Sequence, residues 1–218
     1  MCGATLLGRD VEVSDVVTDS RNSVFGRGAM FVAMRGATHD SHKYIEQMYA
    51  RSVRAFLVEQ QPEQLLPDAG YLYVDNSLEA LQRLAAEHRR NFAGRVVAIT
   101  GSNGKTVVKE WVARVLPQSA KAFVSPMSYN SQLGVPLSVL MLEGDEELAI
   151  FEAGISEVGE MERLERIIRP DVVVFTSLGD AHQEHFVDLE QKAREKLMLA
   201  RSARKIIYHS YYQPLAQL

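Results

Sequence analysis

The sequence predicts an α/β protein, in which a small N-terminal α/β domain is followed by a P-loop domain built on a parallel sheet. Apolar segments of strand length alternate with segments of helical periodicity along the chain. This alternation restarts near residue 91, after a first set of strands and helices. In the second part, a glycine-rich loop ending in Lys-Thr stands between a buried strand and a helix. We therefore expect two domains, at residues 1–90 and 91–218.

The first domain is expected to contain four strands and two helices. Apolar runs bounded by turn residues predict the strands, at 11–17, 29–34, 54–58 and 71–74. The helices are expected at 42–50 and 78–90. Ser77 is a residue type that caps a helix N-terminus, and Leu78, Leu81 and Leu84 share one face of the helix that follows.

The second domain is expected to carry a parallel sheet with helices on both faces, because strands and helices alternate. Its strands are predicted at 95–100, 148–151, 172–175 and 205–208, and its helices at 105–116, 161–168 and 189–200. A domain of about 128 residues is short for a doubly wound fold. We therefore expect this domain to be incomplete and the chain to be a fragment of a longer polypeptide.

Composition excludes several classes of protein. The 218 residues carry a net charge of −4, so a general nucleic-acid coat is not expected. With one cysteine, Cys2, the chain has neither a disulfide scaffold nor a cysteine-based zinc site. We expect no signal peptide, and the sequence contains no apolar stretch of about 18 residues. We expect a cytoplasmic protein without membrane insertion.

The strongest chemical signal is the loop Gly101-Ser102-Asn103-Gly104-Lys105-Thr106. Glycines allow backbone N–H groups to point at phosphate oxygens, and a helix N-terminus favours an anion. Lys105 would contact the β- and γ-phosphates of a nucleotide, and the Thr106 hydroxyl would bind Mg²⁺. The loop is the shorter G-x-x-G-K-T form, because Ile99 occupies the first glycine position of the longer pattern. The alternative is a glycine-rich turn with a solvated lysine.

Three further residues are candidates for the same site. Glu152 follows a buried strand, where a magnesium-binding carboxylate would lie beside a P-loop, although a strand-end glutamate can also face water. His182 follows the next strand, but spacing alone does not separate it from three other histidines, His185, His42 and His39. Lys196 stands within a charge run, which is normally the solvated face of a helix.

Together these residues resemble the Mur ligases, the ATP-dependent enzymes that build the peptide stem of peptidoglycan. The similarity covers nearly the whole chain. It includes the phosphate loop, the segments 18–21, 31–36 and 40–42, and the segment 129–137. The last of these resembles the family members that join D-alanyl-D-alanine to UDP-N-acetylmuramoyl-tripeptide. Segments 106–111, 128–132 and 154–156 resemble a subgroup in which such a ligase is fused to a downstream alanine racemase.

The resemblance implies roles for individual residues. ATP and Mg²⁺ would be the cofactors, with Thr106 and Glu152 serving one magnesium ion. His182 and a carbamylated Lys196 would serve a second, and Lys105, His182 and Lys196 would be catalytic. The substrate-binding residues would be Ser20, Arg21, His42 and Asn130, the first three near the UDP group. The family's C-terminal domain is missing, so we expect the fragment alone to have little or no ligase activity.

Three positions depart from the family pattern. Ser177 stands in place of asparagine, Ser41 in place of glycine and Met198 in place of glutamate. Other functions also stay open: a Mur ligase that adds the third stem residue, folylpolyglutamate synthase, and a non-catalytic nucleotide-binding module. The segment 19–21 disfavours the folate enzyme, and a second metal site would disfavour a pure binding module.

Overall fold

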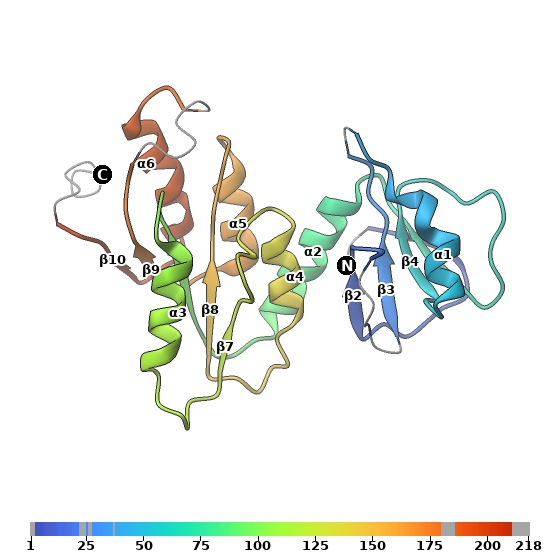
Figure 1. Ribbon diagram of the computed structural model, residues 1–218, viewed down its shortest axis with the longest axis horizontal. Helices are drawn as coiled ribbons and strands as arrows, with labels where there is room; N and C mark the ends of the chain where they lie inside the picture. The colour runs from blue at the N-terminus through green and yellow to red at the C-terminus, as the bar shows by residue number, and fades with distance from the viewer. Residues whose placement is uncertain (1–2, 22–24, 26–27, 37, 180–185, 211–218) are drawn as a thin grey trace. The chain divides into compact units, whose positions relative to one another are not determined.

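The computed structural model describes residues 3–21, 25, 28–36, 38–179 and 186–210. These residues form two compact units, Met1–Leu84 and Ala85–Leu218, and the boundary falls within helix α2 (Ser77–Arg90). Each unit contains a five-stranded sheet together with helices (Figure 1). The predicted α/β class is confirmed.

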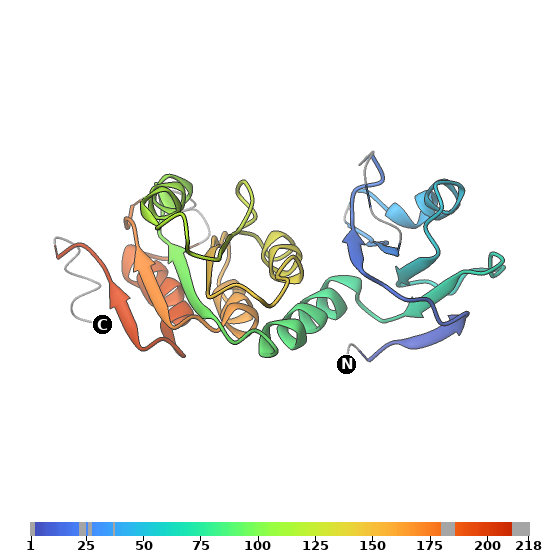
Figure 2. The ribbon, with the colours of Figure 1, turned by 90° about the horizontal axis from the view of Figure 1, so that it is seen from below.

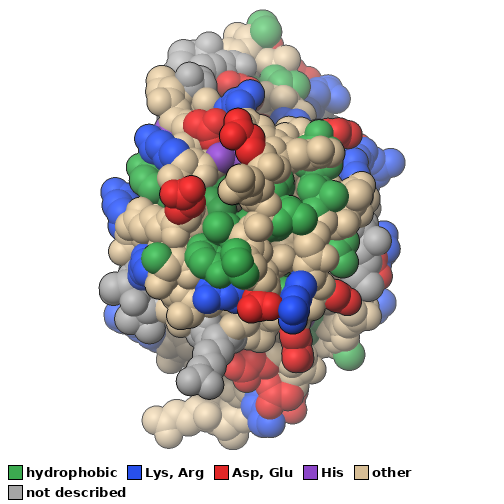
Figure 3. Space-filling model, turned by 90° about the vertical axis from the view of Figure 1, so that its right-hand side faces the viewer, with side chains coloured by type: hydrophobic (Ala, Val, Ile, Leu, Met, Phe, Trp, Pro, Cys, Tyr) green, Lys and Arg blue, Asp and Glu red, His purple; other side chains and the backbone are tan. Residues whose placement is uncertain are grey.

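The first unit contains a mixed sheet with the strand order β1-β5-β4-β3-β2. Four strands run parallel, and β1 pairs antiparallel with β5. The strands are β1 (Thr5–Gly8), β2 (Asp15–Val17), β3 (Ala29–Val32), β4 (Ala55–Val58) and β5 (Gly70–Tyr73). A 3₁₀ turn, Ser41–Tyr44, leads into α1 (Ile45–Ala50). In Figure 3, hydrophobic side chains gather near the middle of the visible face of this unit, with charged side chains around them.

The structure corrects three expectations for the first unit. The strand expected at 11–17 is confined to Asp15–Val17, and Thr5–Gly8 forms a strand that was not predicted. Most of the Thr5–Gly8 strand is exposed, so its side chains carry little periodic signal, and its pairing with β5 comes from the backbone. The cap of α2 is Asn76, whose Oδ1 accepts from the Glu79 N–H at 2.9 Å. Ser77 is instead the first residue of the helix.

The second unit contains a wholly parallel sheet with the order β10-β9-β6-β8-β7. Its strands are β6 (Arg95–Thr100), β7 (Ala122–Val124), β8 (Leu148–Glu152), β9 (Val172–Phe175) and β10 (Lys205–Ile207). Its helices are α3 (Lys105–Val115), α4 (Gly134–Leu140), α5 (Glu160–Ile168) and α6 (Leu189–Leu197), the last continued by a 3₁₀ turn, Met198–Ala200. Of these elements, β7 and α4 were not predicted.

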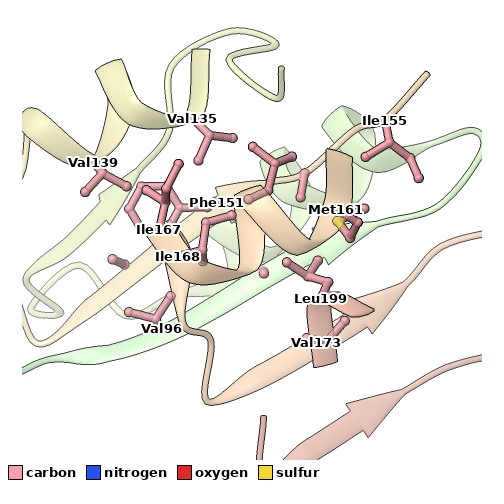
Figure 4. Close-up of a cluster of buried hydrophobic side chains, with 14 of the residues drawn as sticks. Val96, Val135, Val139, Phe151, Ile155, Met161, Ile167, Ile168, Val173 and Leu199 are labelled. Atoms are coloured by element: carbon pink, nitrogen blue, oxygen red, sulfur yellow. The ribbon is translucent and has the colours of Figure 1, made fainter. Parts of the chain in front are cut away.

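The helices cover both faces of this sheet, with α3 on one side and α5 and α6 on the other (Figure 2). Side chains from α4, α5 and the strands form one buried cluster, in which Val139, Phe151 and Ile168 are fully buried (Figure 4). The central strand β6 is buried from Ala98 to Thr100. Since all five strands are parallel, the residues that follow them meet at one edge of the sheet. No helix in the described ranges is long and apolar enough to cross a membrane.

Candidate functional site

The loop after β6 requires glycine at two positions. Gly101 has φ 144°, and a Cβ atom there would lie 2.2 Å from Thr176 Oγ1. Gly104 has φ 78°, a conformation that favours glycine, and it immediately precedes α3. No side chain in the described part of the chain caps this helix. The first N–H groups of α3 therefore face the end of the loop, as an anion-binding helix N-terminus requires.

Hydrogen bonds attach the loop to the segment that follows β9. The Ser102 N–H donates to Ser177 O at 2.8 Å, and the Asn103 N–H donates to Ser177 Oγ at 2.9 Å. Ser102 Oγ lies 3.0 Å from both the N and the O of Gly179. Ser177, which departs from the family pattern, thus contributes its hydroxyl directly to the shape of the loop.

Lys105 folds back over the loop that precedes it. Its Nζ donates to Gly101 O at 3.1 Å and to Ser102 O at 3.3 Å. Burial lowers the pKa of Lys105, while the negative charge of Glu152 opposes that shift. The side chain therefore presents a partly desolvated cation where the phosphates of a nucleotide are expected.

The two residues predicted to bind magnesium lie together. Glu152, which ends β8, is 1% exposed, and its Oε2 accepts from Thr106 Oγ1 at 2.8 Å. Its Oε1 accepts from Asn130 Nδ2 at 2.6 Å. Hydroxyl and carboxylate oxygens are ligands that Mg²⁺ takes, so this pair fits the ion. In the ranges that the structure describes, no group of three or more His, Cys, Asp or Glu side chains is placed to hold a metal.

The charge run on α6 is not a solvated face, so the expectation from the residue pattern alone is wrong. Lys192 is 1% exposed and Lys196 is 3% exposed, one helical turn apart. Lys196 Nζ donates to Gly101 O at 3.2 Å, and Lys192 Nζ donates to Gly179 O at 2.5 Å. Lys196 is thus held against the phosphate loop, and Lys192 against the segment that follows β9.

Lys196 and Lys105 line one open pocket of about 180 Å³. Asn130, Gly154 and Ser156 form part of its wall. Burial, and then the nearby positive charges of Lys105 and Lys192, lower the pKa of Lys196 to about 7 against the opposing effect of Glu195. At neutral pH, a large share of the Lys196 side chains therefore carries an uncharged amine, the form that reacts with carbon dioxide.

The residues Ser20, Arg21 and His42, which are expected near a UDP group, belong to the first unit and form hydrogen bonds or ion pairs within it. The Nε2 of His42 accepts from the Glu59 N–H at 2.9 Å, so the ring proton sits on Nδ1, which donates to Asp40 at 2.6 Å. Arg21 is 89% exposed and pairs with Asp19 through two nitrogens.

Ser20 is buried, and its carbonyl accepts from Arg51 at 2.7 Å. His39, another candidate histidine, stacks on Tyr44. His182 and His185 lie outside the described residues.

Sequence reasoning did not predict that Lys109 and Ser128 lie near the site. It also did not predict that Lys192 is buried there. Lys109 is fully buried on α3, one turn after Lys105. Ser128 Oγ lies 3.4 Å from Thr106 Oγ1. The spacing of four residues between Lys105 and Lys109 was a usable signal, because it puts both on one face of a helix.

Comparisons with known proteins agree on one family. Residues 99–209 match the Mur ligase middle domain. The UDP-N-acetylmuramoyl-tripeptide–D-alanyl-D-alanine ligase of Bacillus subtilis is 30% identical over 207 residues, which are 94% of this chain and 45% of that protein.

Solved structures of MurF give the same result. A crystal structure of MurF from Acinetobacter baumannii has a TM-score of 0.86 at 26% identity and covers 98% of this chain and 48% of that one. MurF from Thermotoga maritima in complex with ADP has a TM-score of 0.82 at 28% identity, over 96% of this chain and 48% of that one. The chain thus spans about half the length of the proteins that it matches.

Proposed function

The chain belongs to the Mur ligase family, and we propose that it forms the nucleotide-binding part of a cytoplasmic ligase that joins D-alanyl-D-alanine to UDP-N-acetylmuramoyl-tripeptide with ATP. One observation carries the proposal. The glycine loop, Lys105, the Thr106–Glu152 pair and the buried Lys196 meet at one edge of a parallel sheet. The similarity to ligases that act on this pair of substrates supports the choice of reaction.

In the proposed reaction, the terminal carboxylate of the UDP-linked peptide attacks the γ-phosphate of ATP, and ADP leaves. The amine of the dipeptide then attacks the resulting acyl phosphate, expels phosphate and forms the amide bond. Negative charges must approach one another in the first step, so positive charge and fixed positions are what the protein has to supply.

This chain's own residues supply several of those functions. Lys105 and the N–H groups at the start of α3 would bind the phosphates. Thr106 and Glu152 would hold Mg²⁺, which offsets phosphate charge when bound. Asn130 would orient the Glu152 carboxylate through its 2.6 Å hydrogen bond.

Lys196 is proposed to act as a carbamate that, like His182, would be a ligand of a second Mg²⁺. Its low exposure and its pKa of about 7 support that proposal, because only an uncharged amine forms a carbamate.

Substrate recognition by the first unit is also a proposal. Ser20, Arg21 and His42 would lie near the UDP group, and the 218-residue chain is proposed to bind the UDP-linked tripeptide without turning it over. Calorimetric titrations with UDP-N-acetylmuramoyl-tripeptide and with UDP-N-acetylmuramoyl-dipeptide, which lacks the third residue, test this recognition. Tighter binding of the tripeptide supports the ligase that adds the terminal dipeptide. A preference for the dipeptide would favour the ligase that adds the third stem residue.

Phosphate release tests the catalytic part of the proposal. We expect the 218-residue chain to bind ATP with Mg²⁺, but to release little or no phosphate when both substrates are present. Lys105→Ala is the control, and it should bind ATP much more weakly than the unchanged chain. Steady phosphate release that requires both substrates would contradict the expected inactivity, and failure to bind ATP at all would contradict the proposed nucleotide site.

The fusion to an alanine racemase is proposed from segments 106–111, 128–132 and 154–156 alone. An antibody raised against this chain should then detect, in a lysate of the source cells, a protein large enough to contain a complete ligase and a racemase. A band of the size of a single ligase would contradict the fusion.

A further inference from the structure

Lys109 is a lysine in an unusual environment. Its side chain is 0% exposed, although it lies on a helix whose neighbouring residues include the exposed Val107 and Trp111. Burying a cation is unfavourable unless its N–H groups find acceptors. Lys109 Nζ donates to Ser125 O at 2.7 Å and to Met127 O, and it lies 3.6 Å from Glu110 Oε1.

The two carbonyls belong to the segment 125–130, which is the first part of the connection from β7 to α4. Ser125 continues the strand pairing, because its N–H donates to Ile150 O at 2.9 Å. Met127 then adopts φ 45°, a left-handed conformation that is uncommon for a residue with a side chain. Lys109 binds the carbonyls on both sides of Pro126 and so holds the chain in this turn.

The same turn delivers two polar side chains to the proposed magnesium site. Ser128 Oγ lies 3.4 Å from Thr106 Oγ1, and Asn130 Nδ2 donates to Glu152 at 2.6 Å. The far end of the segment is fixed as well, since the Gly154 N–H donates to Asn130 O at 2.8 Å. Lys109 thus fixes the near end of a short segment whose side chains reach the site.

The position of Ser128 has a chemical consequence. A threonine hydroxyl that gives a lone pair to a cation keeps its proton, and that proton needs an acceptor. In the structure the Thr106 hydroxyl donates to Glu152, which is the other candidate ligand. Ser128 is a second hydroxyl within reach of Thr106, so its oxygen can accept the hydrogen bond from the Thr106 hydroxyl when Glu152 turns to the metal.

We propose that Lys109 is a positioning residue, which holds the segment 125–130 so that Ser128 and Asn130 complete the polar surroundings of Thr106 and Glu152. This inference rests on the proposed nucleotide function and extends it to residues outside the phosphate loop. Outer partners of metal ligands commonly change metal affinity by 10- to 100-fold when they are removed. Lys109 does not contact the loop 101–104 through any hydrogen bond that the described residues contain, so its effect should be specific to the metal.

The test is a calorimetric titration of the 218-residue chain with ADP, once with Mg²⁺ and once with EDTA. Lys109→Met is compared with Lys121→Met, a matched control at an exposed lysine that pairs with Asp145. We expect Lys109→Met to reduce the gain in affinity from Mg²⁺ about tenfold, while the affinity in EDTA stays within about twofold of the unchanged chain. Lys121→Met should match the unchanged chain in both conditions.

A purely structural role for Lys109 would produce a different result. The affinity for ADP would then fall by the same factor with and without Mg²⁺, or would not change, and either result would overturn the inference. If Lys109→Met does not fold, as judged by circular dichroism, Ser128→Ala decides, because the Ser128 side chain lies at the surface.

Ser128→Ala should reduce the gain in affinity from Mg²⁺ by up to about tenfold, and an unchanged gain would overturn the inference. If the unchanged chain fails to bind ADP in either condition, the proposed function fails and the inference fails with it. Wild-type behaviour of both variants, in a chain that binds Mg²⁺ and ADP, would overturn the inference alone.

Discussion

The two units treat their candidate ligand-binding cations in different ways. In the second unit, Lys105 and Lys196 donate to neutral carbonyl oxygens of the phosphate loop. In the first unit, Arg21 pairs with the carboxylate of Asp19, and the neutral ring of His42 donates to Asp40. The charge of Arg21 is therefore neutralised by a neighbouring carboxylate, whereas, among the described residues, the charge of Lys105 meets only neutral carbonyl oxygens in its hydrogen bonds and is available to a polyanion. The second unit is prepared for a ligand, while the first must exchange partners to bind one.

The largest expected effect separates these two kinds of cation. Lys105→Ala should weaken ATP binding about 100-fold, which corresponds to about 2.7 kcal/mol, because it removes a desolvated charge from the phosphate site. Arg21→Ala, which removes a cation from the first unit, should leave the ATP affinity within about twofold. Isothermal titration of both variants measures this difference. Equal losses in the two variants would remove the distinction between the units.

The phosphate loop also depends on its backbone. Gly101→Ala should destabilise the second unit by about 2–4 kcal/mol, because φ is 144° and the new Cβ would meet Thr176 Oγ1. Gly144→Ala is the matched control: its φ is 94°, but a Cβ there would meet nothing within 4 Å, so about 1 kcal/mol is expected. Denaturant unfolding followed by the fluorescence of Trp111 reports on this unit. Similar losses in both variants would contradict the steric account.

The buried Lys196 predicts a rise in stability with pH. Its pKa is lowered from 10.5 to about 7, so between these values the unfolded chain binds a proton that the folded chain does not. The free energy of unfolding of the second unit should therefore increase from pH 7 to pH 9, and Lys196→Met should remove part of that increase. Urea unfolding at both pH values measures these free energies. An equal change from pH 7 to pH 9 in the variant and in the unchanged chain would contradict the prediction.

The smallest effect belongs to the first unit and to acid pH. The pKa of Asp40 is lowered from 3.8 to about 2, mainly by the hydrogen bond from the His42 N–H and then by the His42 side chain. Its contribution is present above pH 4 and is lost as the pH falls towards 2. Since Asp40 is 39% exposed, less than about 1 kcal/mol is expected. Asp40→Asn should be less stable than the unchanged chain at pH 5 but equal to it at pH 2, as measured by circular dichroism, and a constant difference would contradict the account.

The elements around the phosphate loop were predictable because their signals are local. Strand 95–100 is a run of mostly buried apolar residues, and the loop and α3 follow without a gap. The missed elements lack such signals. The strand Ala122–Val124 has three residues and is stabilised by pairing with β8. The helix Gly134–Leu140 begins with glycine and contains Pro136, which a first helical turn tolerates although the pattern suggests a break.

Candidate site residues could be predicted where they directly follow a strand or its glycine loop. Lys105 and Glu152 follow from the loop and from the end of β8. The burial of the other lysines could not be predicted in this way, because a charged residue on a helix is normally solvated. Burial of Lys109 and Lys192 depends on carbonyl oxygens of distant segments, such as Ser125 O and Gly179 O, and the sequence pattern contains no trace of those contacts.

The central claim is that the sheet edge of the second unit binds a nucleotide together with magnesium. The most direct test is a titration of the chain with ATP in Mg²⁺ and in EDTA, repeated for Glu152→Gln. The account predicts tighter binding with Mg²⁺, and loss of most of that gain in the variant. An equal affinity in Mg²⁺ and in EDTA would contradict it and would favour a nucleotide-binding module that uses no metal.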